Sequence, residues 1–115
     1  MKKYQKFYDL LLDYEILPNG MIYSVEKKEN DLKNAIFYVV DTIEGKSIEY
    51  MEGDLGEVPV EIYCDDLIVC ELIETQTFQA IINRKIEANP KLDFSNPKIF
   101  IEALEFYLEF DTFQK

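Results

Sequence analysis

Helical spacing of apolar positions marks the beginning of the chain. The stripe follows the i, i+3, i+4, i+7 pattern of an amphipathic helix and consists of Tyr4, Phe7, Tyr8, Leu11 and Leu12. Leu10 lies off this stripe, and Pro18 followed by Asn19 and Gly20 is a turn signal. The pattern predicts an N-terminal helix that buries the stripe and ends before Pro18.

Three later segments are apolar without helical spacing, which predicts strands over residues 21–25, 35–41 and 67–73. Segment 35–41 is mostly aromatic or β-branched, and its uninterrupted apolar run is typical of a strand covered on both faces. A polar loop is predicted over residues 27–34 and a turn over residues 42–47.

The region between the last two predicted strands leaves alternatives open. Residues 47–57 contain two glycines and many acids, so we expect a loop or a weak edge strand. Val58, Val60, Ile62 and Cys64 alternate with other residues, which favours a strand. Pro59 also suits the first turn of a short helix. Both interpretations of 58–64 stand.

A helix is predicted to follow the third strand. Thr75 or Thr77 can cap its first turn, and Asn89 followed by Pro90 ends it. Its predicted buried stripe consists of Phe78, Ile81, Ile82 and Ile86.

A second C-terminal helix has a clear start signal. Asn96 is a suitable N-cap, and Pro97 is favoured at the first helical position. The residues expected to face inward are Phe100, Ala103, Leu104, Tyr107 and Leu108. Ile101, Phe106 and Phe110 lie off that stripe, and we expect contacts with a second element or a partner.

These elements predict an α+β fold. We expect a small, mainly antiparallel sheet of about three to five strands, packed with an N-terminal helix and two C-terminal helices. The 115 residues, 48% hydrophobic with four Gly and four Pro, predict a single globular domain over 1–115.

The negative charge is unevenly distributed. The net charge is −11, and the segment from Ser47 to Asn83 carries −9 of it, with nine acids and no Lys, Arg or His. We call this segment the acidic window. Its acids are Glu49, Glu52, Asp54, Glu57, Glu61, Asp65, Asp66, Glu71 and Glu74. Solubility explains a net charge but not its confinement to one window.

A complementary partner explains the acidic window better. Affinity for DNA or RNA depends on neutralising phosphates, so the charge disfavours direct nucleic-acid binding. A focused negative patch instead speeds association with a basic protein and discriminates against other partners. We therefore predict that these nine acids bind a basic partner, such as a nuclease.

Catalytic motifs are missing from the sequence. It has no His to act as a base near pH 7, and no G-x-S-x-G, P-loop or G-x-G-x-x-G motif. The sharpest enzymatic alternative is a divalent cation held by Asp65, Asp66 and Glu61. We favour a solvated acidic surface and predict a binding protein that is not an enzyme, with no cofactor and no metal.

The cysteines and the apolar segments indicate the cellular compartment of the protein. Cys64 and Cys70 are predicted to be free thiols in a reducing cytoplasm, buried as small hydrophobes. The absence of His and of a CxxC spacing argues against a metal or redox pair. Lys6, Asp9 and Asp13 interrupt the first apolar stretch, so we expect no signal peptide. No run approaches the roughly 20 apolar residues of a membrane span. We expect a cytoplasmic protein with no membrane contact.

Three stretches, YDLLLDYEILPNGMIY, ELIETQTFQAIINR and FIEALEFYLEFDTF, resemble small acidic immunity proteins of bacterial polymorphic-toxin systems, especially those of contact-dependent growth inhibition. The resembling features are a first helix leading through Leu17 and Pro18 into a strand, a strand-to-helix passage over 72–82, and a last helix ending near Asp111 and an aromatic residue. The resemblance implies a cytoplasmic protein that binds and neutralises a cognate toxin domain, commonly an RNase or DNase. It carries over no individual contact residues.

Two other functions remain as alternatives. One is an acidic interaction module of another kind, such as a nucleic-acid mimic or an adaptor. The other is a divalent-metal-dependent enzyme.

Overall fold

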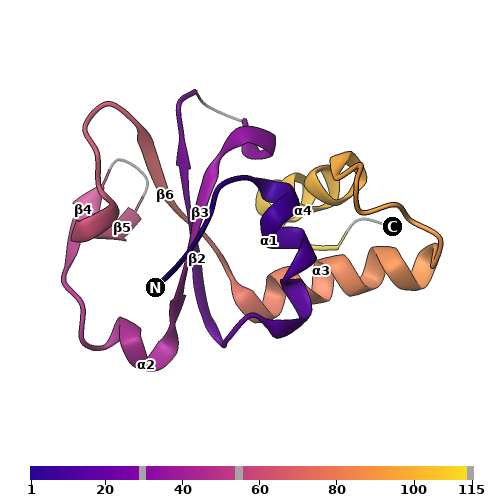
Figure 1. Ribbon diagram of the computed structural model, residues 1–115, viewed down its shortest axis with the longest axis horizontal. Coiled ribbons are helices and arrows are strands. Elements are labelled where there is room, and N and C mark those ends of the chain that lie inside the picture. Colours follow the sequence, from indigo (N-terminus) through magenta and orange to yellow (C-terminus); the bar gives the residue numbers. More distant parts are fainter. Residues whose placement is uncertain (29–30, 54–55, 114–115) are drawn as a thin grey trace.

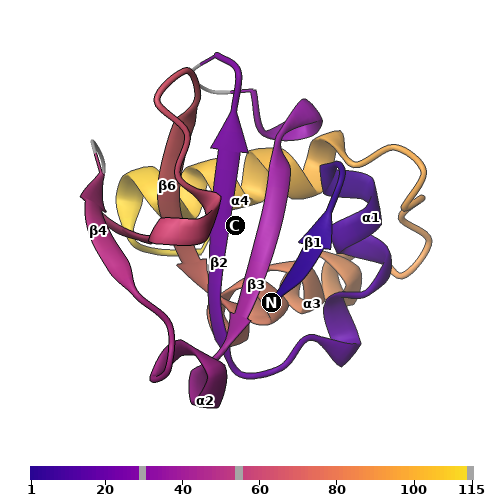
Figure 2. The same cartoon turned by 60° about the vertical axis from the view of Figure 1, so that its left-hand side comes forward.

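Four antiparallel strands form a sheet through the middle of the molecule. The computed structural model describes residues 1–28, 31–53 and 56–113. The order in the sheet is β1-β3-β2-β6, as Figure 2 shows, so that β1 and β6 lie at its two edges. The strands are β1 (Lys2–Tyr4), β2 (Gly20–Glu26), β3 (Ile36–Asp41) and β6 (Ile68–Glu74).

Helices cover one face of this sheet (Figure 1). They are α1 (Phe7–Leu12), α3 (Thr75–Ala88) and α4 (Lys98–Phe110). Phe7 lies at the centre of this layer, with its ring 5.9 Å from that of Phe37 on β3 and 6.1 Å from that of Phe78 on α3. All three rings are fully buried, so the helices and the sheet share one aromatic core.

The other face of the sheet is covered by a hairpin and a short helix. The hairpin pairs β4 (Tyr50–Gly53) with β5 (Gly56–Pro59), and the 3₁₀ helix η3 (Val60–Ile62) follows. A second core lies here, made of Tyr23, Val25, Val40, Val58, Ile62 and Val69. Because Phe37 and Val39 belong to the helix-side core and Val40 to this one, β3 is covered on both faces, as predicted.

Three short helices complete the described elements. They are η1 (Tyr14–Ile16), η2 (Leu32–Asn34) and α2 (Thr42–Gly45). The predicted loop over 27–34 therefore contains η2, although residues 29 and 30 lie outside the described ranges. The predicted turn over 42–47 contains α2, because the Asp41 carboxylate accepts a hydrogen bond from the Ile43 backbone N–H at 2.7 Å and caps the helix.

The α+β prediction is confirmed, as are the three predicted strands. The predicted N-terminal helix, however, starts too early in the chain. Tyr4 lies in β1, opposite Phe37, and α1 begins only at Phe7. Leu10 is fully buried, whereas Leu12 is 54% exposed. Residues 2–4 pair with β3 and are therefore not helical. The buried face of α1 is set by its tertiary contacts and differs from the apolar stripe that was predicted to start at Tyr4.

The ambiguous region divides at Pro59. Residues predicted as loop or weak edge form the β4–β5 hairpin, and β5 ends at Pro59. Proline has no N–H to continue a strand ladder, and it can precede a helical turn. Val60 to Ile62 accordingly form η3, so the predicted alternation does not extend as a strand to Cys64.

The predicted N-caps of α3 and α4 are wrong, whereas α3 ends before Asn89 and Pro90, as predicted. The residue preceding α3 is Glu74, which makes no side-chain cap, and the Thr75 hydroxyl instead bonds to Gly20 of β2. Pro97 precedes α4, also without a side-chain cap from Asn96. Leu108, predicted to face inward, is 43% exposed. Within the described ranges, no helix has the length and apolarity needed to span a membrane.

Candidate partner-binding surface

The acids of the acidic window come from neighbouring elements on one side of the molecule. Glu52 lies on β4, Glu57 on β5 and Glu61 on η3. The others are Glu49 before β4, Asp65 and Asp66 in the turn after η3, and Glu71 and Glu74 on β6. All eight are exposed, and the ninth, Asp54, lies outside the described residues.

A β-bulge directs Glu71 toward this side. The pairing of β2 with β6 skips Leu72, so that Ile22 faces Ile73 while Tyr23 faces Glu71. Leu72 and Ile73 pack with the helix-side core, whereas Tyr23 belongs to the core under β4 and β5. The bulge thus places Glu71 on the side of the β4–β5 hairpin, whereas Leu72 and Ile73 pack on the helix side.

Among the described residues, the acids of the acidic window form no ion pairs. The two ion pairs found there join the Met1 amino group to Glu44 and the Lys2 ammonium to the Asp13 carboxylate, the latter at 3.3 Å. Neither involves an acid of the acidic window. The eight described carboxylates are therefore available to a partner.

Two of these acids oppose each other directly. Glu52 of β4 is the register partner of Glu57 of β5. Like charges directly opposite each other in antiparallel strands are destabilising. Gly56, with φ of 104°, lets the hairpin turn here, and a Cβ on it would lie 3.9 Å from the Glu71 Cβ. The hairpin therefore also brings Glu57 toward the edge strand.

Tyr23 lies under this convergence of acids. It is buried, and burial is the main reason that the pKa of its hydroxyl is raised well above its ordinary value. Tyr50 and the carboxylates of Glu71 and Glu57 raise the pKa further. Side chains from β2, β4, β5 and β6 therefore lie near one another here, and two of them are carboxylates.

Exposed apolar side chains accompany the acids, and the sequence prediction did not include them. Tyr50 is 37% exposed, Val60 44% and Ile43 78%. They lie in regions predicted as turn, loop or ambiguous, and in elements of three or four residues, too short for a periodic signal. Tyr50 and Val60 adjoin Glu49 and Glu61 in the chain, and only the fold shows that their side chains are exposed.

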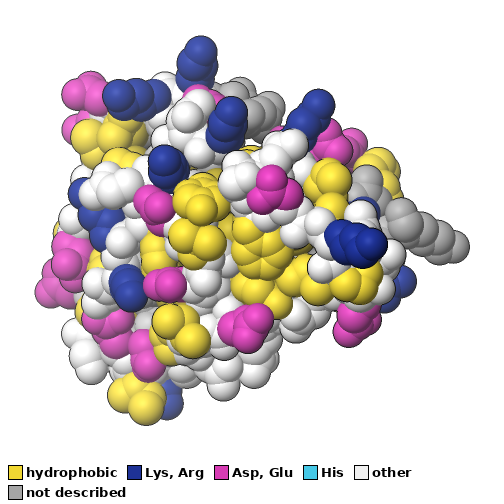
Figure 3. Space-filling model, turned by 45° about the vertical axis from the view of Figure 1, so that its right-hand side comes forward, with side chains coloured by type: hydrophobic (Ala, Val, Ile, Leu, Met, Phe, Trp, Pro, Cys, Tyr) yellow, Lys and Arg dark blue, Asp and Glu magenta, His cyan; other side chains and the backbone are white. Residues whose placement is uncertain are grey.

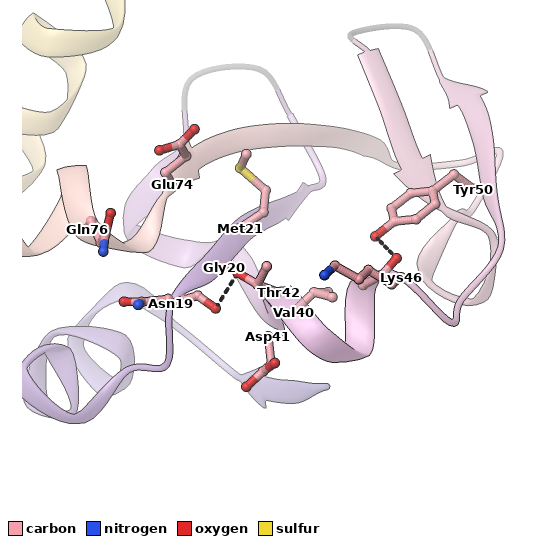
Figure 4. Close-up of a pocket in the computed structure, with 11 residues that line it drawn as sticks. Asn19, Gly20, Met21, Val40, Asp41, Thr42, Lys46, Tyr50, Glu74 and Gln76 are labelled. Carbon is pink, nitrogen blue, oxygen red and sulfur yellow. Dashed lines mark hydrogen bonds between the residues drawn. The ribbon is translucent and has the colours of Figure 1, made fainter.

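A cleft of about 460 Å³ adjoins this surface (Figure 4). Glu74 and Gln76 line it at one end and Tyr50 at the other, with Thr42 between them. The Tyr50 hydroxyl donates to the Gly45 carbonyl at 2.9 Å, and both the N–H and the hydroxyl of Thr42 donate to the Asn19 carbonyl at 2.8 Å. These bonds hold α2 and β4 around an opening, lined by both polar and apolar side chains, that can receive a side chain.

Clusters of potential metal ligands are not found among the described residues. Nowhere in residues 1–28, 31–53 and 56–113 do three or more His, Cys, Asp or Glu side chains gather so that they could hold a metal ion, Glu61, Asp65 and Asp66 included. Cys64 and Cys70 form no disulfide, as predicted, but each is only half-buried, so the prediction that they are buried is wrong. The geometry fits a binding surface.

Comparison with models of protein families, with curated protein sequences and with solved structures gave no match. Function is therefore inferred from the residues and surfaces of this chain.

Proposed function

We propose that this chain is an immunity protein that binds and neutralises a basic toxin domain, a nuclease, through the acidic window. One observation carries the proposal: the eight described acids of the acidic window are all exposed on adjoining elements and none has an ion-pair partner among the described residues. The resemblance of the sequence to immunity proteins supports the same class.

The placement of the acids supports binding over stability. Glu52 and Glu57 face each other across the hairpin, and a lysine at either position would turn a repulsion into an attraction. The fold gains nothing from two carboxylates there. A partner that brings Lys or Arg to this hairpin would relieve the repulsion between Glu52 and Glu57, so the two carboxylates would contribute to binding.

The surroundings supply what a protein interface needs besides charge. Binding energy in interfaces concentrates in a few apolar or aromatic side chains, while surrounding charges set the association rate. Tyr50 and Val60 offer such anchors directly among the acids.

The chemistry of a nuclease explains the inhibition. A nuclease holds nucleic acid with Lys and Arg side chains that neutralise phosphates, and carboxylates match the same cations, bidentately for Arg. A surface dense in carboxylates can therefore occupy a cationic active-site cleft and exclude the substrate.

The test uses the toxin domain encoded immediately upstream of the gene for this chain. We expect the purified chain to bind that domain, block its nuclease activity and rescue growth of cells that express it. The association rate should fall steeply between about 50 and 500 mM salt, because the Debye length shrinks to a few Å over this range.

A matched pair of double variants assigns the surface. Glu57→Gln/Glu71→Gln removes two charges from the acidic window, and Glu15→Gln/Glu87→Gln removes two exposed charges from η1 and α3. Any acid buried against a toxin Lys or Arg should cost about 2–5 kcal/mol of binding free energy when its charge is removed. Equal affinities for the two double variants would contradict the proposal, as would no binding by the wild type.

A further inference from the structure

Helix α4 has an unusual solvent-facing side. With 3.6 residues per turn, Glu102, Glu105 and Glu109 lie one above another at i, i+3 and i+7. Ile99, Phe106 and Phe110 form a parallel row directly beside them, at i, i+7 and i+11. We call these six residues the α4 face.

The apolar row of the α4 face meets solvent. Ile99 is 41% exposed and Phe110 55%, while Phe106 is half-buried. The rings of Phe106 and Phe110 contact each other in a tilted arrangement, with centroids 4.6 Å apart. Figure 3 shows the helical side of the molecule, where hydrophobic side chains reach the surface between charged ones.

The acidic row destabilises the free helix mainly through Glu105 and Glu109, since Lys98 lies at i−4 from Glu102 and offsets part of its charge. Glu105 and Glu109 are like charges at i, i+4, and Glu109 lies in the last turn, where the helix dipole is negative and no basic residue offsets it. Burial raises the pKa of Glu105 above its ordinary value, and the charge of Glu102 adds to this. The chain's single arginine, Arg84, lies over the Phe113 ring at 5.1 Å.

These charges select the occupant of the α4 face. A second copy of the chain would set three glutamates against three glutamates, and an anionic lipid or nucleic-acid surface would be repelled. A polypeptide with apolar side chains flanked by Lys or Arg fits both rows. It would bury the phenylalanines and neutralise the glutamates at once.

We infer that the α4 face is a second contact surface for the basic toxin domain, which places apolar side chains on Phe106 and Phe110 and cations against the three glutamates. The inference rests on the proposed function, since it takes the same partner. In Figure 2 the last turns of α4 extend past β6, the edge strand that carries Glu71 and Glu74. A toxin domain that covers this edge reaches both surfaces.

The first experiment compares two exposed apolar side chains. Phe110 and Leu12 are 55% and 54% exposed, on α4 and α1 respectively, so neither substitution by alanine should impair folding. Against the upstream toxin domain, Phe110→Ala should raise Kd by about tenfold or more, the range of an interface hot spot, and Leu12→Ala by less than about twofold.

The second experiment separates binding from folding. The triple variant Glu102→Gln/Glu105→Gln/Glu109→Gln should raise the urea midpoint of the free protein at low salt, because repulsion is relieved, while weakening toxin binding by about tenfold or more. A residue set with only a structural role would not move these two readouts in opposite directions. The control is Glu87→Gln on α3, which is exposed and outside the α4 face.

The outcomes distinguish the two proposals. If Glu57→Gln/Glu71→Gln weakens the complex but Phe110→Ala and the triple variant bind like wild type, the α4 face is not a contact surface and the proposed function stands. If the wild type does not bind the toxin domain, both are wrong.

Discussion

Two buried hydroxyl groups should respond in opposite ways to removal. Ser24 on β2 and Thr75 at the start of α3 are both fully buried. The Thr75 hydroxyl accepts from the Gly20 N–H at 2.9 Å and lies 3.4 Å from the Gly20 carbonyl. The Ser24 hydroxyl has no hydrogen-bond partner among the described residues. We predict that Ser24→Ala stabilises the protein and Thr75→Val destabilises it.

The magnitudes follow from the difference in partners. A buried polar group without a partner costs about 1–3 kcal/mol, and the small void left by one oxygen returns up to about 1 kcal/mol of that, as for a deleted methyl group. Ser24→Ala should therefore raise the free energy of unfolding by about 1 kcal/mol. Thr75→Val keeps the shape but orphans the Gly20 N–H, so it should lower the free energy of unfolding by about 1–3 kcal/mol.

Urea unfolding followed by circular dichroism measures both changes. The m-values should equal that of the wild type, since the buried area does not change. Thr75→Ser, which keeps the hydroxyl, should retain most of the stability lost in Thr75→Val. A loss of more than about 1 kcal/mol in Ser24→Ala with an unchanged m-value would refute the reasoning, because it would mean that the hydroxyl is satisfied.

Three further variants test other features. Glu57→Lys should raise the free energy of unfolding by about 0.2–1 kcal/mol in urea melts, because it places a cation opposite Glu52; a loss would contradict the like-charge argument. Gly20→Ala should lower the free energy of unfolding by about 3 kcal/mol in the same assay, since its Cβ would lie 1.9 Å from the Val40 carbonyl oxygen. An unchanged stability would mean that β2 and β3 can move apart at this point. The pKa of Tyr23 is raised above 10.0 in the folded state, so its contribution to stability is present below about pH 10 and is lost as pH rises and the unfolded chain ionises. Tyr23→Phe should flatten that alkaline decline in stability measured between about pH 9 and 11, and an unchanged slope would count against it.

The sequence pattern was sufficient to predict a helix or strand where the apolar spacing within that element's own residues is distinctive. The run over 35–41 alternates between two cores and was predicted as a doubly covered strand, and Phe78, Ile81 and Ile82 were predicted as the buried stripe of a helix. The α+β class follows from such signals. The acidic window is also a property of the sequence alone, because charge can be counted without knowing the fold.

Only the tertiary structure decided how distant residues meet. The pairing of residues 2–4 with β3 moved Tyr4 out of the helix, and the bulge at Leu72 separated Glu71 from Ile73, which simple alternation would place on one face. The opposition of Glu52 and Glu57 depends on the register of a hairpin that the sequence left as loop or weak strand. Whether Phe110 lies in the core or in solvent depends on how far α4 extends past the sheet that it covers. Such outcomes come from long-range contacts, which no window of neighbouring residues contains.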